Sequence, residues 1–107
     1  MNLRIKRGDD FFATHAVMTD VWSAMFRSYC VIAECTGRNA NVFYELGMAH
    51  TLNKPTILLT QDIEDIPFDI RQLRHIHYVN NTSGLDILEK SLEMALLRLV
   101  FGEDPND

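Results

Sequence analysis

Two short apolar runs place the strongest constraint on how this chain can fold. Residues 30–33 read Cys-Val-Ile-Ala and residues 56–60 read Thr-Ile-Leu-Leu-Thr, and each run is bounded by polar or turn-forming residues. Runs of this kind are typical of strands that are buried on both faces of a parallel sheet. A helical pattern lies between them, so the sequence predicts a strand–helix–strand unit with a right-handed crossover.

Turn residues set the limits of the helix in this unit. Residues 36–39 read Thr-Gly-Arg-Asn, and Asn39 is a suitable N-cap for a helix that runs to about Leu52. The sequence Asn-Lys-Pro at 53–55 ends that helix, because proline cannot continue it. The residues expected to face the sheet are Val42, Leu46 and Ala49.

Predicted strands and helices alternate along the rest of the chain. We expect amphipathic helices over residues 14–28 and 83–101, strands over 3–7 and 75–79, a loop over 61–67, a short helical turn over 68–73 and a helix cap at Gly102. No repeat or linker interrupts the chain, so residues 1–107 are expected to form a single domain. The predicted fold class is α/β, a three-layer parallel sheet of about four strands with flanking helices.

Charge and composition restrict the possible partners. Ten Lys and Arg against fifteen Asp and Glu give a net charge of −5, which argues against a nucleic-acid partner. A small phosphorylated ligand stays compatible, because one Arg and a helix N-terminus can hold it. The absence of a basic leader and of a long apolar run predicts a cytoplasmic protein without a membrane partner. Cys30 and Cys35 are expected to be free and buried.

The loop over residues 36–39 is the first candidate for ligand binding. It follows a predicted strand and opens a helix, which is where open parallel sheets bind their ligands. Gly37 lets the backbone approach a ligand closely, Arg38 could contact a phosphate, and the free N–H groups of the helix favour an anion. The alternative is an ordinary turn glycine beside a solvated surface charge.

The next helical turn carries a second group of candidates. Asn41 and Glu45 are four residues apart and share one helical face, with Tyr44 beside them. An amide and a carboxylate suit a sugar: Glu45 could attack or stabilise an anomeric carbon while Asn41 orients hydroxyl groups. The alternative for Glu45 is a solvated surface carboxylate. Gly47 lies in the helix interior, where close packing of helix on sheet would explain it.

A longer motif surrounds these residues. Residues 33–50 read Ala-Glu-Cys-Thr-Gly-Arg-Asn-Ala-Asn-Val-Phe-Tyr-Glu-Leu-Gly-Met-Ala-His, and residues 54–61 read Lys-Pro-Thr-Ile-Leu-Leu-Thr-Gln. This pattern resembles bacterial domains related to nucleoside 2-deoxyribosyltransferases, which are distant structural relatives of Toll/interleukin-1 receptor domains. Residues 66–71 and Tyr78 are also similar to that group.

The resemblance implies a flavodoxin-like, Rossmann-like sheet with a pocket for a nucleoside or nucleotide. In the transferases the Glu of the Glu-Leu-Gly motif is the nucleophile, and in NAD-cleaving Toll-like relatives a helix-borne Glu serves similar chemistry. The resemblance therefore makes Glu45 the catalytic candidate, without a cofactor or a metal. The expected substrate-binding residues are Thr36, Gly37, Arg38, Asn39, Asn41, Tyr44 and Asp69.

The chain also departs from the family pattern. Glu34 replaces the usual Asp, Ala40 replaces the usual Pro, and the family's first strand and helix have no obvious counterpart, as in an N-terminally truncated relative. A missing central strand would leave backbone groups unpaired, so we expect a homodimer or strand exchange. Two functions stay open: an enzyme that cleaves or transfers at an N-glycosidic bond, or a non-catalytic nucleotide-sensing or oligomerisation module.

Other polar groups have simpler interpretations. His75 and His77 share a strand face, with His50 as a third possible ligand, but no Cys or Asp pattern supports zinc and we favour packing or surface roles. The acidic residues within 61–67 are expected to solvate a loop. Asp69 either lines the cleft, as the resemblance implies, or caps a helical turn at Phe68.

Overall fold

The computed structural model describes residues 15–102, with side chains from residue 21 onward, so the strand predicted over residues 3–7 lies outside this range. The elements are α1 (His15–Arg27), β1 (Val31–Glu34), α2 (Ala40–Thr51), β2 (Thr56–Thr60), the 3₁₀ turns η2 (Ile63–Asp65) and η3 (Phe68–Ile70), β3 (His75–His77) and α3 (Thr82–Phe101). Strands and helices alternate as predicted, which confirms the α/β class. Among the described helices, none combines the length and apolar character that crossing a bilayer requires.

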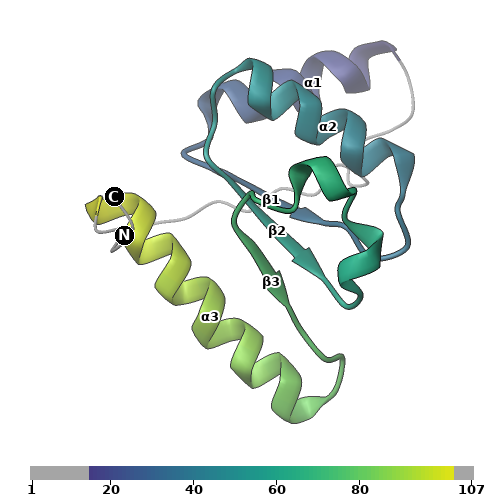
Figure 1. Cartoon of the computed structure of the whole chain (residues 1–107). Coiled ribbons are helices and arrows are strands. Elements are labelled where there is room, and N and C mark those ends of the chain that lie inside the picture. Colours follow the sequence, from purple (N-terminus) through teal and green to yellow (C-terminus); the bar gives the residue numbers. More distant parts are fainter. Residues whose placement is uncertain (1–14, 103–107) are drawn as a thin grey trace.

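The described strands form one parallel sheet with the order β1-β2-β3. Val31 is paired with Thr56 at the start of the β1–β2 register, and Leu58 is paired with His75 at the start of the β2–β3 register. In Figure 1, α1 and α2 lie together on one side of the sheet, whereas α3 lies apart from both, next to β3. The three strands therefore end at a common edge, beside the start of α2.

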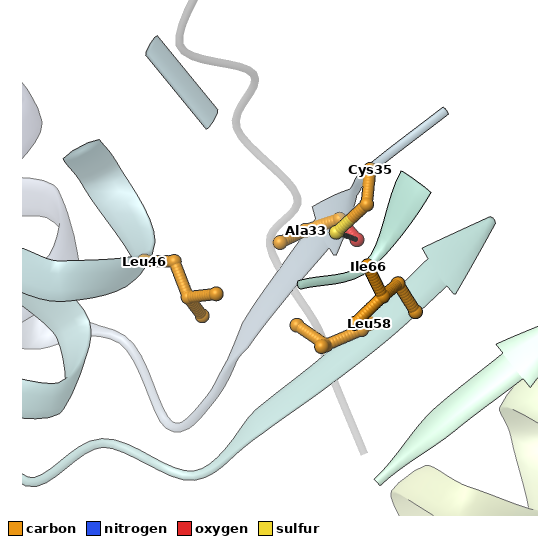
Figure 2. Close-up of a cluster of buried hydrophobic side chains, with 5 residues drawn as sticks. All are labelled: Ala33, Cys35, Leu46, Leu58 and Ile66. Carbon is orange, nitrogen blue, oxygen red and sulfur yellow. Dashed lines mark hydrogen bonds between the residues drawn. The ribbon is translucent and has the colours of Figure 1, made fainter. Parts of the chain in front are cut away.

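Apolar side chains of α2 attach it to the sheet. Figure 2 shows Leu46 pointing from α2 toward Ala33 and Leu58, with Cys35 and Ile66 completing the cluster. A second cluster joins α1 to the other half of α2 and contains Val21, Met25 and Ala49. Leu46 and Ala49 are buried and Val42 packs against the first cluster, so the predicted inward face of this helix is confirmed.

Polar caps fix the ends of the helices. The Asn39 side chain accepts a hydrogen bond of 2.8 Å from the N–H of Asn41, which confirms the predicted N-cap of α2. Asn81 does the same for α3, accepting from the N–H of Gly84 at 2.7 Å. Gly102 ends α3 with a φ of 67°, the left-handed conformation that glycine adopts without steric cost.

Several limits differ from the predicted ones. β1 includes Glu34 but not Cys30, and Val31 is only half-buried where burial on both faces was expected, because β1 pairs along one edge only within the described residues. β3 ends at His77, since the pairing with β2 stops there. The close-packing explanation for Gly47 is wrong: this residue is exposed and a Cβ added to it would meet nothing within 4 Å.

Candidate ligand site at the carboxyl edge of the sheet

Each described strand is followed by a polar side chain that reaches its neighbours. Thr36 follows β1, Gln61 follows β2 and Tyr78 follows β3. The N–H of Gln61 donates to the Thr36 hydroxyl at 2.9 Å, and the Gln61 side-chain amide donates to the Tyr78 hydroxyl at 3.3 Å. Parallel strands end at the same edge, so residues far apart in the sequence meet there.

The carboxylate of Glu34 is the centre of this group. One of its oxygens accepts the N–H of Thr36 at 2.6 Å, and the other accepts the hydroxyl of Tyr78 at 2.5 Å. Hydrogen bonds to an ionised carboxylate are shorter and stronger than neutral ones. We call Glu34, Thr36, Gln61 and Tyr78 the strand-end cluster. Burial raises the pKa of the Tyr78 hydroxyl, and the hydrogen bond to Glu34 and the Glu34 charge raise it further.

The loop predicted to hold a phosphate already donates to a second carboxylate. The N–H of Gly37 donates to an oxygen of Asp65 at 2.8 Å, and Gly37 has a φ of 83°. Arg38 also has a positive φ, of 57°, and its N–H donates to the carbonyl of Cys35 at 3.1 Å while its side chain is exposed. Two consecutive N–H groups of this loop, those of Thr36 and Gly37, thus bind carboxylate oxygens of the protein itself.

The α2 candidates form a separate group. Asn41 and Tyr44 are exposed and Glu45 is half-buried. Glu45 lies one turn before Ala49, which packs against α1, so it is on the side of α2 that faces α1. Ala33 and Cys35 point toward α2, so strand alternation directs the side chain of Glu34 to the opposite face of the sheet. Glu34 and Glu45 thus lie on different sides of the sheet, near the same edge.

Asp69 belongs to neither group. It lies exposed in η3, whose N-cap residue is Pro67 and which has no side-chain cap, so Asp69 does not cap that turn. Arg71 stabilises the segment that contains η2 and η3. Its Nε donates to the carbonyl of Ile66 at 2.9 Å, and its Nη2 lies 3.3 Å from the carboxylate of Glu64.

The acidic run in this loop does more than the predicted solvation. Asp62 caps η2 by accepting the N–H of Glu64 at 3.0 Å, and Asp65 bonds to the loop after β1. Asp62 and Glu64 are exposed in the loop, in keeping with the predicted solvation, and the hydrogen bonds of Asp62 and Asp65 add a structural role. The Asp65 carboxylate thus attaches the segment between β2 and β3 to the loop after β1.

The histidines of β3 bind backbone carbonyl oxygens. Nδ1 of His75 lies 2.9 Å from the oxygen of Leu73, and Nε2 of His77 lies 3.0 Å from the oxygen of Gln61. Among the side chains that the structure describes, those of residues 21–102, no group of three His, Cys, Asp or Glu is arranged to hold a metal ion.

Four residues of this edge were not among the predicted site residues: Glu34, Gln61, Asp65 and Tyr78. A usable signal existed for Gln61, which directly follows the strand predicted over residues 56–60, whereas Tyr78 lies inside the strand predicted over residues 75–79. No local signal marks Asp65, since its contact with Gly37 joins residues 28 positions apart. Comparisons of the chain with protein-family models, curated proteins and solved structures gave no match.

Proposed function

We propose that this chain binds a nucleoside or nucleotide at the carboxyl edge of its sheet and cleaves or transfers at the N-glycosidic bond. The observation that supports this best is the strand-end cluster, which gathers hydrogen-bonding groups from the ends of the three described strands beside the start of α2. Parallel sheets bind ligands at this edge, and hydroxyl, amide and carboxylate groups suit the hydroxyls of a sugar.

Glu45 is the residue we propose for the chemistry. Its carboxylate would form a bond to the anomeric carbon while the bond from that carbon to the base breaks, and the base would leave with the electron pair and take up a proton. Water or a second base would then displace Glu45. Partial burial favours such a role, because a carboxylate shielded from water interacts more strongly with a developing positive charge. Asn41 and Tyr44 would position the sugar.

The same proposal includes a more specific assignment of the α/β fold. A flavodoxin-like sheet related to the nucleoside 2-deoxyribosyltransferases fits the parallel order β1-β2-β3 and the motif on α2. In this proposal the protein acts in the cytoplasm as a homodimer.

One observation favours a second candidate, a non-catalytic nucleotide-sensing or oligomerisation module. The N–H groups of Thr36 and Gly37 donate to Glu34 and Asp65, so a phosphate would have to displace a carboxylate to reach them. A motif whose anion-binding groups are satisfied internally can persist because it stabilises the fold.

Base release separates the two candidates. Wild-type protein, Glu45→Gln and the control Glu89→Gln, at an exposed position of α3, would be incubated with deoxynucleosides, nucleoside monophosphates and NAD. We expect wild type and the control to release base, as measured by chromatography, and Glu45→Gln to lose at least about 100-fold in rate. No release combined with thermal stabilisation by a nucleotide would favour the sensor. No release and no stabilisation would contradict ligand binding altogether.

A further inference from the structure

Helix α3 carries a second apolar stripe, which is exposed. Ile87, Met94 and Phe101 recur at intervals of seven residues, and Leu97 follows Met94 by three. These side chains are 65%, 52%, 68% and 37% exposed, respectively. A surface helix of a single domain needs one apolar stripe, the one that faces the core, so the second stripe requires its own explanation.

The contacts of α3 with the sheet fix which side faces outward. Ala95 is buried, and its carbonyl accepts the guanidinium of Arg74 at 3.4 Å. The carbonyl of Leu99 accepts the hydroxyl of Tyr29 at 3.2 Å. These two attachments hold the Ala95 side of the helix against the body of the protein. Figure 1 shows α3 lying apart from α1 and α2, beside β3.

The seven-residue spacing matches the seam of a two-stranded coiled coil. In the heptad notation abcdefg, position a is occupied by Ile87, Met94 and Phe101, and position d by Leu97. A second helix with the same spacing would therefore interdigitate with these side chains. The other d position is Lys90. A single polar residue in a seam lowers stability but fixes the register, and the long Lys side chain can extend its charge to water.

The charges beside the seam select the orientation of the pair. Glu93 lies at the g position and Arg98 at the following e position, and both are exposed. In a parallel pair, g of one helix lies against e of the other, so Glu93 would meet the partner's Arg98, twice by symmetry. An antiparallel pair would bring g against g and e against e, which leaves Glu93 and Arg98 without this match.

We infer that the outer face of α3 binds a second copy of this chain as a parallel helix pair. The exposed seam and the buried Ala95 lie on different faces of α3, so pairing through the seam leaves the contact of α3 with its own sheet in place. The seam from Ile87 to Phe101 is about 21 Å long. It is short for a coiled coil, so the dimer should depend on protein concentration. This inference is independent of the proposed ligand and chemistry.

A charge-reversal cycle tests both the pairing and its orientation. Sedimentation velocity over a range of concentrations would compare wild type, Glu93→Arg, Arg98→Glu and the double variant. We expect a reversible wild-type dimer, a dissociation constant raised at least about 5-fold in each single variant, and recovery in the double variant. A monomeric wild type at all concentrations, or a double variant weaker than either single variant, would overturn the inference.

Cross-linking gives a second, direct readout. In a parallel pair the two copies of position 87 lie against each other, whereas in an antiparallel pair position 87 would lie near position 101. In a Cys30→Ser background, Ile87→Cys should form a disulfide-linked dimer on mild oxidation much faster than the control Glu89→Cys, which is exposed on the flank of α3. Equal rates for the two variants, with circular dichroism showing both folded, would contradict the parallel seam.

Discussion

At the scale of single residues, one carboxylate organises the carboxyl edge of the sheet. Glu34 accepts from the backbone of Thr36 and from the hydroxyl of Tyr78, and so links the end of β1 to the end of β3 across β2. A carboxylate with two short hydrogen bonds holds its neighbours in place as well as itself. The Glu34 side chain is long enough to reach from the end of β1 to the Tyr78 hydroxyl.

Removing the Tyr78 hydroxyl should weaken this edge. Tyr78→Phe loses the bond to Glu34 and the bond from Gln61, and we expect the free energy of unfolding to fall by about 1 kcal/mol, because the group is only half-buried. Urea denaturation measures the change. Tyr44→Phe is the matched control, since Tyr44 is 62% exposed and should lose almost nothing. Equal losses in both variants would mean that the strand-end cluster contributes no stability.

The buried thiol of Cys35 predicts a pH dependence. Burial, followed by the charges of Glu34 and Asp65, raises its pKa from 9.0 to about 11. The folded protein thus holds this proton more tightly than the unfolded chain, so the contribution to stability is complete below pH 9 and is lost as the pH rises toward 11. We expect wild type to lose on the order of 2 kcal/mol more than Cys35→Ala over this range. Parallel pH profiles of the two proteins would contradict the shift.

At the scale of elements, the start of α3 depends on a glycine. Gly84 is buried in the first turn of the helix, and its N–H donates to the cap Asn81. A Cβ at this position would overlap the carbonyl group of Val79 and lie 3.0 Å from the side-chain oxygen of Asn81. The connection from β3 to α3 is therefore closed too tightly for any side chain at residue 84.

Two glycine substitutions should have opposite effects on stability. Gly84→Ala must shift either the backbone of Val79 or the cap, and should lower the free energy of unfolding by about 1–3 kcal/mol. Gly47→Ala meets open space in the middle of α2 and should raise it by up to about 1 kcal/mol. Thermal unfolding of the two variants and wild type measures both changes. A Gly84→Ala variant more stable than wild type would show that the first turn of α3 does not lie against Val79 and Asn81 as described.

Patterns of neighbouring residues predicted the helices and strands well, but they predicted the tertiary contacts of these elements less well. Asn39 and Gly102 act through their nearest neighbours in sequence, so the ends of α2 and α3 could be predicted. The setting of Gly47 depends on how α2 lies on the sheet, which no local pattern encodes. The same holds for the site: Gly37 follows from a strand–loop–helix pattern, whereas its contact with Asp65 requires knowing that the segment after β2 folds back to the end of β1.

At the scale of the whole molecule, the two sides of the sheet carry different features. The side with α1 and α2 contains the described apolar clusters and the helix that presents Glu45 (Figure 1). The other side has α3, whose outer face we assign to a second copy of the chain. The edge between them holds the strand-end cluster. Ligand binding at this edge and pairing through α3 therefore use separate surfaces, and a variant that disrupts one should leave the other intact.

The most direct test of the central claim is to map where a ligand binds. Amide resonances of ¹⁵N-labelled protein would be followed by NMR during titration with deoxynucleosides, nucleoside monophosphates and NAD. Binding at the carboxyl edge predicts shifts at Thr36, Gly37, Asn41 and Glu45, with the amides of α3 unchanged. Shifts confined to other parts of the chain, or no shifts with any of these compounds at millimolar concentration, would contradict the claim that this edge is a nucleoside site.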